Sequence, residues 1–276
     1  MAVSGMSAAD GIGRERKRES FNTVAALYDR YRRGYPREIV AQVVEAAGIG
    51  PGSRVLEIGP GSGQLTRPLL ALGIRVTAVE LGEALAAAGR QKLARFPHLE
   101  IVISAFEDWE LPREPFDAVV AATSFHWIAP EVRAPKAAQA LKPGGILLAV
   151  YPHHVQGNDA AFFRDTQVYY LKWGLSSDSE WHPPDADEVP AMYPDIDRCH
   201  DFAQVERRRI RRTIGYTTDQ YVGLLSTDSL ILTLPAPAQD GFLTDIRTLI
   251  DSRYEGRVSR DYLYELVAAR KRAAPI

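Results

Sequence analysis

Short apolar runs alternate with amphipathic stretches through the first half of the chain. The apolar runs are rich in Val, Ile and Leu, which is typical of strands buried on both faces of a sheet. They lie at 54–58, 74–79, 99–103, 116–121 and 146–150. Stretches with apolar residues at helical spacing lie between them, at 37–47, 64–72 and 131–141. This alternation predicts an α/β fold built on a parallel sheet.

The pattern changes after Tyr151. Aromatic residues crowd the stretch 162–181, and the following stretch up to Asp201 is rich in Asp, Pro and Ser. These features predict a helical cap followed by a loop. Charged and apolar residues then alternate over 205–214, which indicates an edge strand with one charged face. The last predicted elements are two helices and an antiparallel strand, at 217–227, 239–252 and 258–267.

The most informative motif is Leu56-Glu57-Ile58-Gly59-Pro60-Gly61-Ser62-Gly63, where the first strand passes into a glycine-rich turn. Such a turn lets the backbone approach a ligand, because no Cβ atom stands in the way and positive φ angles are allowed. The dinucleotide fingerprint would need glycine at the position of Gln64. Glu57 would also repel a pyrophosphate but not an amino acid or a cation. The motif therefore points away from a dinucleotide and from a triphosphate.

The second predicted strand ends in Glu80, which lies 21 residues after Gly59. At this spacing an acidic side chain can bind the diol of a ribose. The alternative for the turn is a tight strand-to-helix corner without any ligand. Agreement between the glycines, the acid and the spacing favours a nucleoside ligand over that alternative.

These residues resemble the first motif of the class I S-adenosylmethionine-dependent methyltransferases. More narrowly, the chain is similar to small-molecule methyltransferases of the trans-aconitate and actinobacterial secondary-metabolite type. The resemblance covers about 20–150. It implies a Rossmann-like, mostly parallel seven-stranded sheet with an antiparallel C-terminal strand and a helical cap insertion. The residues implied at the cofactor S-adenosylmethionine are Tyr28, Arg32, Glu57, Gly59, Pro60, Gly61, Gly63, Gln64, Glu80, Leu81, Ala105, Phe106, Glu107 and Thr123.

The same resemblance assigns roles at the two ends of the cofactor. Arg32 is expected to face the methionine carboxylate, and Tyr28 and Tyr35 to line the site, although Arg33 replaces a proline that is usual there. The alternative is that both tyrosines only pack a helix onto the sheet. At the adenine end, the usual aspartate is replaced by a smaller residue. The expected contacts there come from Ala105, Phe106, Glu107 and Leu81.

Domain boundaries follow from these assignments. We expect a basic N-terminal tail, the S-adenosylmethionine-binding domain, a substrate-covering cap insertion, and a C-terminal part of the sheet with helices. The corresponding ranges are 1–19, 20–150, 151–203 and 204–276.

The predicted strand ends place His126 at the same edge of the sheet as the glycine turn, Glu80 and Phe106. Methyl transfer from a sulfonium is an in-line displacement, so the protein mainly positions the acceptor and excludes water. A base is needed only when the acceptor carries an acidic proton. His126 is the candidate catalytic base, and a hydrogen-bond donor to the substrate or a packed ring are its alternative roles.

The acceptor is expected to be a small aromatic or apolar metabolite, such as a prenylated or indole-like molecule of secondary-metabolite biosynthesis. Aromatic rings can cover a flat ligand and stabilise positive charge, although they can equally be the private core of a cap. Of His153 and His154, at most one faces the site, because neighbours in an extended segment point to opposite sides. The expected substrate residues are Tyr35, Trp127, His153, His154, Phe163, Tyr169 and Trp173.

Other functions remain open at this stage. A carboxylate acceptor of the trans-aconitate kind would need converging arginines, for which Arg32 and Arg33 are the candidates. A regulator that binds S-adenosylmethionine without turnover would need the same cofactor residues. A dinucleotide oxidoreductase shares the fold, but the missing third glycine and the lack of a Tyr-x-x-x-Lys motif speak against it.

The charge and composition of the chain limit the kinds of partner that we expect. The net charge is -2 and the pI near 6.3, so we expect a small-molecule substrate and neither nucleic acid nor membrane, despite the five arginines in 205–214. Cys199 is the single cysteine, and no run is long and apolar enough to span a membrane, which favours a cytoplasmic location. No metal is expected. The tail 1–19 is interpreted either as frayed or as an arm that forms a homo-oligomer.

Overall fold

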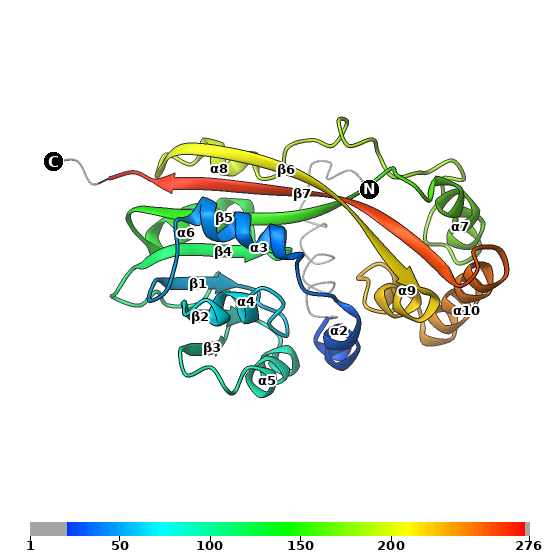
Figure 1. Ribbon diagram of the computed structural model, residues 1–276, viewed down its shortest axis with the longest axis horizontal. Helices are drawn as coiled ribbons and strands as arrows, with labels where there is room; N and C mark the ends of the chain where they lie inside the picture. The colour runs from blue at the N-terminus through cyan, green and yellow to red at the C-terminus, as the bar shows by residue number, and fades with distance from the viewer. Residues whose placement is uncertain (1–20, 274–276) are drawn as a thin grey trace. The chain divides into compact units, whose positions relative to one another are not determined.

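The computed structural model describes residues 21–273 (Figure 1). The predicted tail 1–19 lies outside this range. The chain folds into two compact units. We call the first the core unit, which contains 33–153, 190–210 and 264–273, and the second the accessory unit, with 21–32, 154–189 and 211–263. The four predicted domain ranges remain predictions.

The described residues form a seven-stranded sheet with the order β3-β2-β1-β4-β5-β7-β6. Neighbouring strands from β3 to β5 pair in parallel, and β7 is antiparallel, as predicted (Figure 1). The strand order reverses between β1 and β4, which is where an open parallel sheet binds ligands. The strands are β1 (Arg54–Ile58), β2 (Arg75–Glu80), β3 (Leu99–Ile103), β4 (Phe116–Ala122), β5 (Leu141–Val155), β6 (Phe202–Thr217) and β7 (Arg257–Lys271).

The predicted helices are present, with ends that follow local signals. Gly48 ends the first helix of the core unit with φ of 62°, a conformation that glycine adopts without strain. Thr217 and Gln220 form a capping box where β6 passes into a helix. The helices are α2 (Ala25–Tyr31), α3 (Arg37–Ala47), α4 (Thr66–Ala71), α5 (Glu83–Lys92), α6 (Pro130–Ala140), α7 (Ala160–Lys172), α8 (Pro194–Arg198), α9 (Thr218–Leu225) and α10 (Ala236–Arg253). Short 3-10 turns lie at η1 (Phe125–Trp127) and η2 (Ile231–Thr233).

The core unit is built around the central strands. Leu56, Val119 and Leu147 from β1, β4 and β5 have no exposed surface, and alanines of α6 pack on the same cluster. Burying such side chains stabilises the fold by about 1.5–3 kcal/mol each. The three parallel strands of this cluster therefore hold the edge that carries the glycine turn.

Two local predictions were wrong. The fifth strand was predicted to start at Ile146, but β5 already begins at Leu141. The pairing of β4 with β5 shifts register between Phe116 and Ala118, so the extra residues are taken up as an irregularity within one strand. The loop predicted up to Asp201 also contains the short helix α8.

The accessory unit has its own apolar core. Phe162 of α7 and Phe242 of α10 are fully buried, and Phe163 is nearly so. Tyr169 and Trp173 pack on this cluster at its partly buried side. The aromatic density seen in the sequence thus serves at least the packing of this unit. Among the described residues, no helix combines the length and apolar character needed to cross a bilayer.

Candidate functional site

The turn after β1 brings backbone atoms to the edge of the sheet. Gly59, Gly61 and Gly63 have φ angles of 64°, 60° and 97°, which disfavour residues with a Cβ atom. A Cβ atom on Gly59 would lie 2.6 Å from the Cβ atom of Ser124. Ser124 in turn donates from its hydroxyl to the carbonyl oxygen of Ile58. Glycine is therefore required at position 59 by both conformation and space.

Glu80 fixes this turn to the end of β2. Its Oε2 accepts from the backbone N–H of Gly61 at 2.9 Å, and its Oε1 accepts from the N–H of Gly82 at 2.9 Å. The side chain is only 6% exposed. Each carboxylate oxygen has further lone pairs, so the group can also accept from the hydroxyls of a diol.

Glu57 lies under the turn and is buried at 2% exposure. Its Oε2 atom has no hydrogen-bond partner. Burial raises the pKa of Glu57 to about 7, and the nearby Glu80 carboxylate acts in the same direction. A buried carboxyl with an unused oxygen is suited to a positively charged group of a ligand, because that group would favour the ionised form.

Thr123 follows β4 and adopts φ of 60°, which is unusual for a β-branched residue. Its N–H donates to the carbonyl oxygen of Val150 at 2.8 Å. Its hydroxyl is hydrogen-bonded to Tyr35 Oη at 2.6 Å, and the ring of Tyr35 packs edge-on against Tyr264 at 6.4 Å. Strained residues of this kind concentrate at functional sites, and here the strain places Ser124 against the glycine turn.

His126 lies in the short turn η1 that follows. Its ring centre is 4.8 Å from that of Trp127 and 5.0 Å from that of Tyr151. The Nδ1 atom is buried without a partner. Burial lowers the pKa of His126 to about 3, and the positive charge of Arg133 acts in the same direction. The imidazole is therefore neutral and weakly basic, which favours a packed ring or a hydrogen-bonding role over a general base. The catalytic assignment of His126 remains a prediction.

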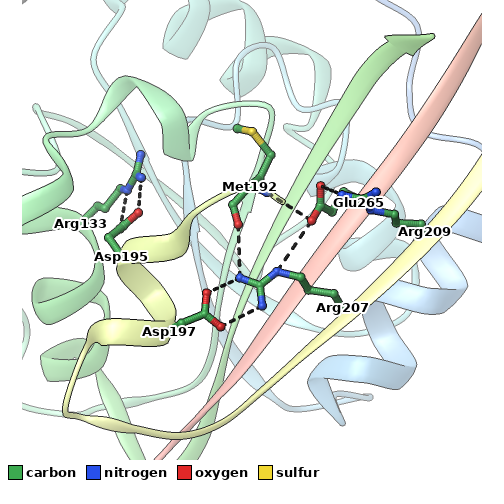
Figure 2. Close-up of polar contacts among 7 residues, drawn as sticks. All are labelled: Arg133, Met192, Asp195, Asp197, Arg207, Arg209 and Glu265. Atoms are coloured by element: carbon green, nitrogen blue, oxygen red, sulfur yellow. Dashed lines mark hydrogen bonds and ion pairs between the residues drawn. The ribbon is translucent and has the colours of Figure 1, made fainter. Parts of the chain in front are cut away.

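His153 continues this row of rings along β5. Its ring centre is 4.9 Å from that of Tyr151, and its Nε2 lies 3.1 Å from an oxygen of Glu265. Glu265 has no exposed surface and also accepts from the Met192 N–H at 3.2 Å and from Arg209 at 3.4 Å (Figure 2). Burial raises the pKa of Glu265, but these hydrogen bonds and the Arg209 charge outweigh it, so the net pKa is lowered.

Two further ion pairs support this end of the core unit. Arg207 donates to both oxygens of Asp197, and its Nε lies 3.7 Å from Glu265 (Figure 2). Arg133 of α6 forms a second bidentate pair with Asp195 of α8. Bidentate arginine pairs fix geometry as well as charge. Together they hold α8 and the edge strand β6 in place beside β7.

The structure does not bring all of the predicted residues into one unit. The core unit holds Tyr35, Glu57, Gly59, Pro60, Gly61, Gly63, Gln64, Glu80, Leu81, Ala105, Phe106, Glu107, Thr123, His126, Trp127 and His153. The accessory unit holds Tyr28, Arg32, His154, Phe163, Tyr169 and Trp173.

Arg32 already has acceptors within the accessory unit. Its Nε donates to Thr227 Oγ1 at 2.9 Å, and a terminal nitrogen donates to the Thr227 carbonyl at 2.9 Å. The guanidinium carbon also lies 5.6 Å from the centre of the Tyr28 ring. These contacts anchor Arg32 to the residues after α9. The expected contact with a methionine carboxylate remains a prediction.

Lys136 of α6 packs against the segment that follows β3. Phe106 is 1% exposed, and the Nζ atom of Lys136 lies 5.5 Å from the centre of its ring. Lys136 also donates to the backbone carbonyl of Glu107 at 2.7 Å. The backbone at this corner is thus held from α6. The expected adenine contacts of Ala105 and Leu81 remain predictions.

Sequence reasoning missed Ser124, Tyr151 and Glu265. Ser124 contacts Ile58 across 66 positions, and Glu265 contacts His153 across 112 positions. Local spacing carries no information about such pairs. For Ser124, its place directly after a buried strand was the only available signal.

Comparison with known proteins decides the class. Residues 56–149 match a family described as a methyltransferase domain. An uncharacterized methyltransferase of Mycobacterium tuberculosis is 28% identical over 235 residues, which cover 84% of this chain and 85% of that protein. Together with the fold, these matches support a class I S-adenosylmethionine-dependent methyltransferase.

Solved structures agree with this methyltransferase in fold. A protein of Anaeromyxobacter dehalogenans assigned as a type II methyltransferase superposes with a TM-score of 0.60 at 23% identity, covering 88% of this chain and 99% of that one. Phosphoethanolamine N-methyltransferase 2 of Haemonchus contortus, in complex with S-adenosylhomocysteine and phosphomonomethylethanolamine, gives a TM-score of 0.53 at 16% identity. The alignment covers 91% of this chain and 57% of that longer protein.

Proposed function

We propose that the methyltransferase transfers a methyl group from S-adenosylmethionine to a small aromatic or apolar metabolite of secondary metabolism. The observation that supports this proposal is the row of rings at the ends of β4 and β5. The ring of His126 contacts those of Trp127 and Tyr151, and the ring of Tyr151 contacts that of His153. Burial keeps His126 neutral. Aromatic rings of this kind suit a flat, apolar acceptor.

The residues of the core unit fit the cofactor. The glycine turn suits the close approach of a ligand because its positive φ angles are those of glycine. Glu80 can accept from ribose hydroxyls, and the unused oxygen of Glu57 suits a cationic group. When bound, S-adenosylmethionine supplies a methyl group that is already activated by the sulfonium. The protein then needs only to orient the acceptor and to exclude water.

Calorimetric titration tests the donor. We expect S-adenosylmethionine and S-adenosylhomocysteine to bind and NAD not to bind. Glu80→Ala should weaken both sulfur compounds about ten- to hundredfold, because hydrogen bonds to a charged group contribute about 1.5–3 kcal/mol. Glu83→Ala, an exposed acid in the first turn of α5, is the matched control. Binding of NAD alone would overturn the proposal.

An acceptor screen with labelled S-adenosylmethionine separates the alternatives. Label in aromatic or apolar metabolites supports the proposal, whereas label in tricarboxylates such as trans-aconitate favours the second acceptor class. Donor binding without transfer to any acceptor favours a regulator. The predicted cytoplasmic location and a homo-oligomer through the N-terminal tail are separate predictions that this screen does not address.

A further inference from the structure

Within residues 21–273, one arginine of the accessory unit has no counter-charge. Arg260 lies near the start of β7, and its Nε atom is buried without a hydrogen-bond partner. A terminal nitrogen donates to Tyr221 Oη at 3.1 Å, and the guanidinium carbon lies 5.0 Å from the centre of that ring. Among residues 21–273, no carboxylate forms an ion pair with it. A guanidinium withdrawn from water in this way is costly unless an anion joins it.

The nearby carboxylates are engaged elsewhere. Asp261 is adjacent in β7 and so points to the opposite face, where it accepts from Thr213 Oγ1 at 2.6 Å and from the Asn158 N–H at 3.1 Å. Asp228 accepts from the Leu230 N–H at 2.9 Å. Burial raises the pKa values of Tyr170 and Tyr221, and the charge of Asp228 adds to this effect. Asp228 makes no ion pair with Arg260.

Neutral polar groups surround the arginine. Tyr262 lies two residues further along β7, on the same face, and its Oη is 3.2 Å from Tyr216 Oη. The ring of His154 is 6.3 Å from that of Tyr262, and its Nε2 atom is buried without a partner. Burial lowers the pKa of His154 to about 2, and the charge of Arg260 adds to the effect. These groups can donate hydrogen bonds, but none of them supplies a negative charge.

The chemistry of this cluster defines its missing partner. A guanidinium presents a planar fork that matches a carboxylate, and tyrosine hydroxyls can donate to the same oxygens. The partly exposed rings of Tyr262 and His154, whose centres are 6.3 Å apart, provide an aromatic surface beside the guanidinium. We propose that Arg260, Tyr221 and Tyr262 bind the carboxylate group of a small aromatic acid. Such an acid is either the methyl acceptor or a ligand that is not methylated, and both share this chemistry.

Calorimetric titration of the full chain tests the site. The probes are benzoate, cinnamate and indole-3-acetate, each beside its neutral amide. We expect at least one acid to bind ten- to hundredfold more tightly than its amide, because the amide lacks the charge that Arg260 requires. Equal binding of all acids and amides, or no binding of any acid, overturns the proposal.

Two variants assign the effect to Arg260. Arg260→Met removes the charge but keeps the length of the stem, and we expect it to abolish the preference for the acid. Arg257→Met replaces an exposed arginine of the same strand and should leave the preference unchanged. Arg260→Lys keeps the charge without the fork and should retain part of the preference, which keeps the test open even when the methionine variant does not fold. A full preference in Arg260→Met overturns the proposal.

Donor binding is measured in parallel. A chain that binds S-adenosylmethionine but no aromatic acid contradicts this site alone. A chain that binds the acid but not S-adenosylmethionine contradicts the proposed function alone. Once acid binding depends on Arg260, methyl label from S-adenosylmethionine in the bound acid identifies it as the acceptor, and its absence identifies an unmethylated ligand.

Discussion

The absence of a Cβ atom at Gly59 permits the shape of the glycine turn. The φ of 64° at Gly59 resembles that of Gly48, at 62°, but the space around the two residues differs. A side-chain methyl group would collide with Ser124 at position 59, whereas it would meet no atom within 4 Å at position 48. The two glycines therefore separate backbone strain from crowding. This pair gives a matched test of why the turn needs glycine.

Gly59→Ala should destabilise the protein by several kcal/mol and abolish S-adenosylmethionine binding. Gly48→Ala should cost only about 1–2 kcal/mol, the strain of a left-handed alanine. Thermal unfolding and calorimetric titration check both effects. Equal losses of stability in the two variants would show that the approach of Ser124 is unimportant.

The buried carboxyl of Glu57 makes stability depend on pH. Its pKa is raised from 4.5 to about 7, so between these values the folded state binds more protons than the unfolded state. The stability contribution is therefore present below pH 4.5 and is lost as the pH rises through 7. Glu57→Gln removes this loss. The free energy of unfolding of the variant should exceed that of the wild type by about 3 kcal/mol at pH 8.5 but not at pH 4.5.

Urea unfolding at both pH values, without cofactor, provides the measurement. A gain that is the same at pH 4.5 and pH 8.5 would reflect altered packing and not titration. S-adenosylmethionine affinity of the wild type should rise with pH through 7, because the ionised carboxylate favours the cationic ligand.

At the scale of elements, one glycine lets two helices of the accessory unit come together. A Cβ atom on Gly223 of α9 would lie 2.3 Å from the ring of Tyr31 in α2. Arg32 adds hydrogen bonds to Thr227 at the end of the same contact. The position of α2 therefore depends on a small residue in α9.

Gly223→Ala should destabilise the packing of α2 by about 1–3 kcal/mol, the usual cost of overfilling a packed interface. Proteolysis within 21–32 should then become faster. Gly215→Ala, in open space on β6, is the control and should show neither effect. Unchanged proteolysis in Gly223→Ala would mean that α2 does not rely on this contact.

Element prediction from the sequence succeeded where the signal is local. The helix 37–47 with its terminal glycine, the strand 54–58 and the edge strand around 205–214 were all confirmed. The start of β5 was wrong because its register against β4 depends on a partner strand, not on its own sequence. The glycine turn and Glu80 were found from spacing, while Glu265 and Ser124 were not, because their contacts join distant segments.

At the scale of the whole molecule, β7 contributes to the core of both units. Val258 packs in the aromatic cluster of the accessory unit, whereas Val267 and Ala269 pack in the central cluster of the core unit. A chain ending at residue 256 should therefore lack a cooperative thermal transition in both units. Calorimetry and circular dichroism check this outcome. A thermal transition as large as that of the full chain would show that one unit folds without β7.

The order of the strands also has a consequence for synthesis on the ribosome. Because β7 lies between β5 and β6 but follows both in the chain, the sheet has a gap until β7 emerges. During that interval β6 has no neighbour to pair with on either side. Its row of arginines carries positive charges that repel those of another nascent chain, and would therefore protect the unpaired strand until β7 is made.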